Sequence, residues 1–231
     1  MMGFLITAHV FQQAPDPAGL EGLPKSIGYR LYQHRGANLY LLDTFRSSKT
    51  PRYPFQTLLP AADIPLEFPQ GLELLERVFA QLGPLNLANG FKRSYVNFAL
   101  LLNRLLKLPV FSFVSDDDEL DFTCSATDGA TNRLRCRCGD LVISYSGGRV
   151  QIAPLAPEAE EDEDLLTDTA TFKAALPDVE VLPRATPWNS QLHWIAIEEL
   201  QAFAGIRQPI LGLGSFDPTA DESDWQLVVA R

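Results

Sequence analysis

Polar and apolar residues alternate through the middle of the chain, from about residue 110 to residue 155. The apolar positions form five short runs with a period of two, which is typical of strands that bury one face. These positions are Phe111 and Phe113; Leu120, Phe122, Cys124 and Ala126; Leu134, Cys136 and Cys138; Leu141, Ile143 and Tyr145; and Val150 and Ile152. The pattern predicts an antiparallel β-meander over residues 110–155.

Glycine-containing dipeptides mark two turns of this meander. Gly139-Asp140 and Gly147-Gly148 suit two-residue hairpin loops with positive φ. Such loops place apolar residues opposite one another, as a shared buried face requires. The expected pairs are Cys138 with Leu141, Cys136 with Ile143, Leu134 with Tyr145, Tyr145 with Val150, and Ile143 with Ile152.

The hairpin through residues 127–131 needs an odd number of loop residues, because Cys124 and Leu134 belong on the same face. A three-residue loop centred on Gly129 meets this condition. It pairs Asp121 with Arg137, Thr123 with Arg135 and Ser125 with Arg133 on the opposite, polar face. This arginine ladder suits either a solvated face whose charges pair across strands or a surface that binds an anion.

Apolar residues spaced three and four apart predict two amphipathic helices before the meander, over residues 71–82 and 93–107. We expect both to cover its apolar face, which makes the fold class α+β. Further strands are predicted over residues 4–11, 27–33, 39–45 and 226–230, a loop over 15–24, and short helices over 165–176 and 195–203.

Proline density and charge divide the chain into three parts. Five prolines between residues 46 and 69 predict a long covering loop. Residues 1–156 are expected to form the main α+β domain and residues 157–168 an acidic linker or loop. Residues 169–231 are expected to add a helix and a strand to the same domain.

The chain is acidic, with 29 Asp and Glu against 19 Lys and Arg among 231 residues and a formal net charge of −10. This charge argues against a nucleic-acid ligand and favours a basic protein partner. Three cysteines, an odd number, suggest a reducing compartment. Without a basic leader or a long apolar stretch, we expect a cytoplasmic protein that is not inserted in a membrane.

Carboxylates gather in two places that could contact a basic partner. One is the turn formed by Asp116, Asp117, Asp118 and Glu119, and the other is the block formed by Glu160, Glu161, Asp162 and Glu163. The turn lacks the ligand spacing of a calcium loop, so no metal site is predicted. The cysteines are expected to be buried thiols, and the scattered histidines His9, His34 and His193 to be structural or exposed.

No catalytic motif and no cofactor motif is recognised in the chain. The leading hypothesis is a non-enzymatic protein that binds, and thereby neutralises, a basic protein partner. In general character it is similar to the small acidic immunity proteins that neutralise basic bacterial toxins. One alternative is an enzyme or binding module that holds an anionic small molecule with Arg133, Arg135 and Arg137. Another is a structural subunit of an assembly.

Overall fold

The computed structural model describes residues 5–46, 77, 86–116, 121–138, 141–154, 173–174, 177–182 and 225–231. In this part of the chain the strands are β1 (Leu5–Phe11), β2 (Ile27–His34), β3 (Tyr40–Arg46), β4 (Val110–Asp116), β5 (Asp121–Thr127), β6 (Ala130–Cys138), β7 (Leu141–Ser146), β8 (Arg149–Pro154), β9 (Glu180–Val181) and β10 (Trp225–Ala230). The helices are α1 (Pro17–Glu21) and α3 (Asn86–Leu106).

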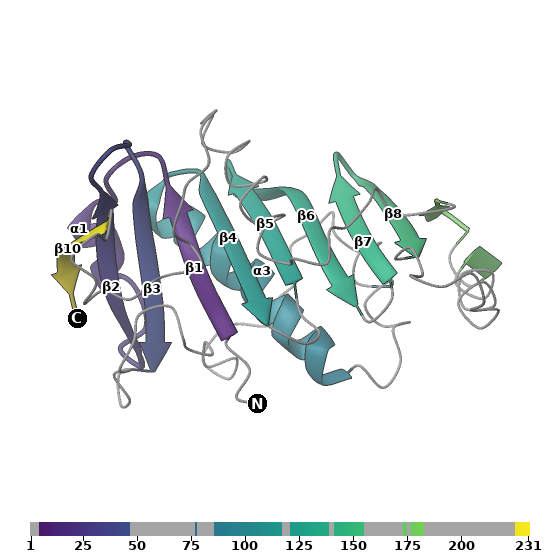
Figure 1. Cartoon of the computed structure of the whole chain (residues 1–231), viewed down its shortest axis with the longest axis horizontal. Coiled ribbons are helices and arrows are strands. Elements are labelled where there is room, and N and C mark those ends of the chain that lie inside the picture. Colours follow the sequence, from purple (N-terminus) through teal and green to yellow (C-terminus); the bar gives the residue numbers. More distant parts are fainter. Residues whose placement is uncertain are drawn as a thin grey trace.

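All ten strands belong to one sheet, in the order β10-β2-β3-β1-β4-β5-β6-β7-β8-β9 (Figure 1). Neighbouring strands are antiparallel, except that β8 and β9 run parallel, so the sheet is mixed. Strand β1 pairs with β3 on one side and with β4 on the other, and thereby joins the N-terminal strands to the meander. The chain is therefore a sheet-rich α+β protein.

The register predicted for the last two hairpins of the meander is confirmed. Cys136 lies opposite Ile143, Leu134 opposite Tyr145, and Tyr145 opposite Val150. Both glycines of the β7–β8 loop have positive φ, at 58° and 81°. Glycine reaches this region without steric penalty, which is why it suits such a turn.

The predicted three-residue loop between β5 and β6 is wrong. Thr127 pairs with Ala130, so the loop has two residues, Asp128 and Gly129, with φ of 49° and 76°. The register shifts beyond Ser125, and the extra residue is a β-bulge at Asn132. The extra residue in the bulge shifts the register by one position, as a third loop residue would have done. The predicted Thr123–Arg135 and Ser125–Arg133 pairs are therefore still present. The predicted Asp121–Arg137 pair lies one step beyond the last paired residues.

The first apolar run of the meander lies on the other face of the sheet from the rest. Ser112 pairs with Cys124 and Phe111 pairs with Ser125, so Phe111 and Phe113 share the face of the arginines. Both phenylalanines are nevertheless buried, as are Val110 and Ser112 on the helix side. A strand that is buried on both faces carries apolar residues at successive positions. An apolar residue in such a strand therefore does not show which face of the sheet is covered by the helix.

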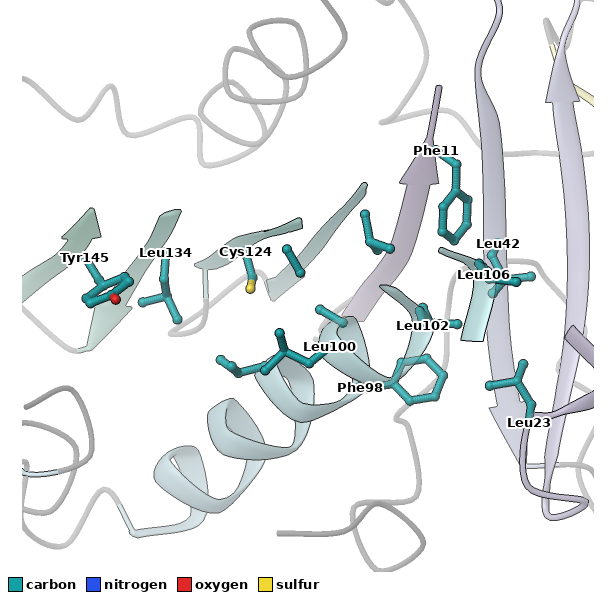
Figure 2. Close-up of a cluster of buried hydrophobic side chains, with 14 of the residues drawn as sticks. Phe11, Leu23, Leu42, Phe98, Leu100, Leu102, Leu106, Cys124, Leu134 and Tyr145 are labelled. Atoms are coloured by element: carbon teal, nitrogen blue, oxygen red, sulfur yellow. The ribbon is translucent and has the colours of Figure 1, made fainter. Parts of the chain in front are cut away.

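Helix α3 lies along one face of the sheet and contributes six buried residues to the main core (Figure 2). Its buried residues Phe98, Leu102 and Leu106 belong to the same cluster as Cys124 and Leu134. The helix begins at Asn86, before the predicted start at residue 93. No helix within the described ranges is long and apolar enough to cross a membrane.

Helix α1 lies where a loop was predicted. Asp16 caps its N-terminus by accepting a hydrogen bond from the Ala18 backbone N–H at 3.1 Å, and Pro17 occupies the first helical position. A Cβ added to Gly19 would come within 2.9 Å of the Leu105 carbonyl oxygen, so glycine allows α1 to approach α3 closely. Pro17 thus begins a helix inside a stretch predicted to be a loop.

Several predicted elements lie outside the described residues. They are the helix over 71–82 except Arg77, most of the helix over 165–176, the helix over 195–203, the acidic segment 157–168 and the proline-rich loop 46–69 except its first residue. Arg77 is helical, and its guanidinium donates a hydrogen bond to Asp178 at 3.3 Å.

Candidate functional site

Three rows of side chains cross the arginine-bearing face of the meander at right angles to its strands. Row one contains Ser125, Arg133, Ser146 and Arg149; row two contains Thr123, Arg135, Ser144, Gln151 and Glu180; row three contains Val142, Ala153 and Leu182, beside the backbone of Arg137. The register that the hairpins impose places these residues side by side although up to 59 positions separate them in the chain, from Thr123 to Leu182.

A hollow of about 340 Å³ lies over these rows. It is lined by Arg133, Leu134, Arg135, Val142, Ser144, Tyr145, Ser146, Gln151, Ala153 and Leu182. The structure thus brings two of the three predicted ladder arginines, Arg133 and Arg135, into one concave site. Of Arg137 only the backbone is described, in β6 opposite Val142.

The two arginines differ in their surroundings. Arg133 is exposed, whereas Arg135 is half-buried and its Nε atom is enclosed. A guanidinium presents a planar fork of donors that matches two oxygens of a carboxylate or phosphate. Partial burial strengthens such contacts because the local dielectric constant is lower than in water. On this physical ground, an anion placed between the two would be held more strongly by Arg135 than by Arg133.

Row two ends in a hydrogen bond between side chains. The Gln151 amide Nε2 donates to Glu180 Oε2 at 2.9 Å, which leaves the amide oxygen of Gln151 as an acceptor. Beside it, the hydroxyl of Ser144 can donate or accept. Row two thus offers Arg135 as a cationic donor, neutral polar groups in its middle and the Glu180 carboxylate at its end. No group of His, Cys, Asp and Glu that could hold a metal ion is found among the described residues.

His9 is a buried polar group whose partners sequence reasoning missed. Its Nδ1 lies 2.8 Å from Ser112 Oγ and its Nε2 lies 3.5 Å from Thr44 Oγ1, while its ring packs against Phe98 at 4.9 Å. Burial lowers the pKa of His9 to about 3, so the imidazole is neutral. Because His9, Ser112 and Thr44 have no exposed surface, this cluster stabilises the core and offers a substrate no access.

Arg30 and Asp43 form a second polar cluster, in the N-terminal half of the sheet. They are paired across β2 and β3, with 3.7 Å between Arg30 Nη1 and Asp43 Oδ2, and Asp43 is fully buried. The Arg30 guanidinium also lies over the Phe45 ring at 5.2 Å. The strands predicted over residues 27–33 and 39–45 contain both residues, and pairing these strands antiparallel would have placed Arg30 near Asp43.

The structure tests few of the other predicted site residues. Cys124 is buried in the core, and burial raises the pKa of its thiol to about 12, which makes the thiol unreactive. Only the backbone of Cys136, Cys138 and Asp116 is described. The remaining predicted partner-binding residues, Asp117, Asp118, Glu119, Glu160, Glu161, Asp162 and Glu163, lie outside the described residues.

Comparison with known proteins adds no relative: no family model, no curated protein and no solved structure matches this chain. Its function is therefore inferred from the geometry and chemistry of its own residues.

Proposed function

We propose that this protein binds an anionic small molecule in the hollow on the arginine-bearing face of its meander. One observation carries the proposal: Arg133, Arg135, Ser144 and Ser146 line a single hollow of about 340 Å³. That volume lies in the range of small-molecule sites, roughly 300–1,000 Å³. Arg137 follows in the same ladder, and its backbone lies opposite Val142 near the end of β6.

The local charge of the hollow opposes the charge of the whole chain. The formal net charge of −10 repels an approaching anion at long range. At physiological ionic strength this repulsion is screened beyond about 8 Å. Within that distance the guanidinium groups of Arg133 and Arg135 dominate, because they contact the ligand directly.

The experiment is calorimetric titration of the full chain with acetate and with inorganic phosphate at low salt, repeated for Arg135→Gln. Hydrogen bonds to charged groups contribute about 1.5–3 kcal/mol each, so this variant should bind about tenfold or more weakly. Arg104→Gln is the matched control, because Arg104 is an exposed residue of α3 and its loss changes the net charge equally. Absence of any anion binding, or equal losses in both variants, would contradict the proposal.

The charge of the chain favours a second candidate function, the neutralisation of a basic protein partner by a non-enzymatic, immunity-protein-like chain. Complementary charge speeds encounter and raises specificity. Once capture from source-cell extract has identified a partner, its affinity would be measured for the variant with Glu160→Gln, Glu161→Gln, Asp162→Asn and Glu163→Gln. An unchanged affinity with unchanged salt dependence would exclude this block as the contact. Solution mass would separate both candidates from an assembly subunit.

We also propose that a second helix covers the sheet and that the protein is cytoplasmic. The helical conformation of Arg77 and its bond to Asp178 support a helix over residues 71–82. The free, buried thiol of Cys124 suits a reducing compartment.

A further inference from the structure

Strand β10 forms one edge of the sheet and pairs with a single neighbour, β2, among the described strands (Figure 1). Its six residues, Trp225–Ala230, include no charged residue and no proline. Leu227 and Val228 are each 52% exposed, and no other large apolar side chain is exposed in the described part of the chain. Proteins usually protect an edge strand from further pairing by charge, by proline or by short length. Strand β10 has none of these protections.

The last hydrogen bonds between β10 and β2 show which backbone groups point away from the sheet. Arg231, the residue after β10, donates its N–H to the Tyr29 carbonyl at 2.9 Å, and its own carbonyl accepts from the Tyr29 N–H at 3.1 Å. Successive residues of an antiparallel strand direct their N–H and C=O groups to opposite sides. The backbone groups of Ala230 therefore point outwards.

The middle of β10 follows the same rule. On β2, the His34 N–H donates to the Leu39 carbonyl, on the side of β3. Tyr32, two residues earlier in the same strand, faces the same side. Leu227 lies opposite Tyr32, so its N–H and C=O groups also point away from β2. No described strand lies on that side.

We propose that β10 pairs antiparallel with β10 of a second copy of this chain, so that the two sheets join into one across a two-fold axis. This inference goes beyond the proposed function and does not depend on it. Full overlap brings the midpoints of the two strands together and places Leu227 of one copy opposite Val228 of the other. Each copy then supplies partners for the outward backbone groups of the other and covers its exposed apolar pair.

The chemistry of the edge favours a second copy over a basic partner protein. Because β10 is uncharged, it offers a basic strand no electrostatic contact, whereas an equally uncharged strand such as β10 itself complements it. Antiparallel pairing also places the end of one strand, followed by Arg231, beside the start of the other, preceded by Asp224. Parallel pairing would instead set like charges side by side at both ends.

The opposite edge of the sheet makes this pairing a closed one. Strand β9 has only two residues, Glu180 and Val181, so it cannot pair along the six residues of β10 to build a head-to-tail filament. Pairing of β10 with itself uses the same surface on both chains and is complete after two of them. We therefore expect a dimer and no larger species.

The test is sedimentation equilibrium of the full chain over a wide range of protein concentrations. The average mass should rise from that of one chain to that of two and stop there. Leu227→Lys should raise the dissociation constant at least about tenfold, because two ammonium groups would lie close together at the centre of the paired strands. Ala130→Lys is the matched control, because it makes the same change of charge at an exposed position of β6.

Hydrogen exchange measures the same contact without any substitution, and so tests the inference even if Leu227→Lys does not fold. Raising the concentration of the parent protein should slow exchange of the β10 amides, because pairing covers their outer edge. Exchange in β9, at the opposite edge, should not change. Equal slowing at both edges, or no slowing in β10, would contradict the inference.

The outcomes of sedimentation are equally distinct. A protein that stays monomeric at every concentration would overturn the inference, and so would a dimer that Leu227→Lys weakens no more than Ala130→Lys does. Growth beyond two chains would rule out a closed pair. If the parent stays monomeric but retains from cell extract a protein that Leu227→Lys does not retain, the edge accepts a different strand and the second copy is wrong. None of these results depends on whether anions bind the hollow.

Discussion

At the scale of single residues, the environment of His9 shows how the sheet accommodates a polar group in its core. Both ring nitrogens face hydroxyl groups, those of Ser112 and Thr44, from the strands on either side. The ring packs against the ring of Phe98 of α3 at an interplanar angle of 59°. A hydroxyl can donate or accept, so it satisfies a neutral imidazole in either tautomer. It cannot compensate for burial of a positive charge, and His9 therefore remains neutral in the folded protein.

This neutrality predicts how stability depends on pH. The pKa of His9 is about 3 in the folded protein, compared with about 6.5 for an unperturbed histidine. Between these values the unfolded chain binds a proton that the folded chain does not, so the free energy of unfolding decreases as pH falls from 6.5 towards 3. At pH 5 the loss is about 2 kcal/mol relative to pH 7. Urea titrations at both values would measure it.

His9→Gln should reduce that difference, because the replacement does not titrate. His34→Gln is the control, since His34 is only partly buried. If the His9 variant loses as much stability between pH 7 and pH 5 as the parent protein, the imidazole is not the group responsible.

What the sequence predicts about single residues depends on how far away their partners lie. Arg135 lies beside Ser144 in the register that follows from the two-residue loop predicted between their strands. Ser112 lies 103 residues from His9, and nothing local in the sequence relates the two. Whether His9 would be buried or exposed could therefore not be decided from the strand pattern alone.

At the scale of elements, one side chain connects the end of α3 to the β5–β6 hairpin. The amide of Asn103 donates to the Leu108 carbonyl at 2.7 Å, and its oxygen accepts from the Gly129 N–H at 2.7 Å. The first contact satisfies a carbonyl just beyond the helix, and the second fixes the tip of the hairpin against it. Asn103 is buried, as these contacts require.

Asn103→Ala should therefore destabilise the protein more than an ordinary surface change. It leaves a carbonyl and an N–H without their partner, and each such group costs about 1–3 kcal/mol if it stays buried. Chemical denaturation would measure the change. Arg104→Ala, at the adjacent exposed position, is expected to lie within about 0.5 kcal/mol of the parent protein. Similar values for both variants would show that the bridge contributes nothing.

The elements that the sequence mispredicts share a physical cause. In β4, both faces are buried, so the apolar pattern assigns Phe111 and Phe113 to the wrong face of the sheet. In the β5–β6 hairpin, the turn and the bulge act together, and only their combined residue count can be deduced from the apolar pattern. The pattern of apolar residues predicts which side chains are buried, but it does not predict which element packs against them.

At the scale of the whole molecule, β1 determines that the two groups of strands form one sheet. It pairs with β3 through residues near its C-terminal end and with β4 along most of its length. Strand β4 follows β3 only after a long stretch of chain, so hairpin rules do not predict that β1 lies between them. The same applies to β10, which returns to pair with β2 at the edge.

This strand order predicts a gradient of amide hydrogen exchange across the sheet. Strand β1 is hydrogen-bonded on both edges, and its residues Ala8 to Phe11 are fully buried. At the edge, β10 carries the exposed residues Leu227 and Val228 and a register shift between Leu227 and Val229. We expect amides of β1 and β4 to exchange only through global unfolding, and those of β10 to exchange through local opening.

Arg231→Ala extends this prediction to the connection between β10 and the rest of the sheet. The Arg231 guanidinium donates to the Ile27 carbonyl at 2.8 Å and lies over the Tyr29 ring at 4.9 Å. Its removal should speed exchange in β10 and leave β1 and β4 unchanged, because the opening it favours is local. Mass spectrometry of exchanged peptides would measure both. If the substitution accelerated exchange equally in all three strands, β10 would belong to the cooperative unit that unfolds as a whole, and the edge would be as essential to the sheet as its centre.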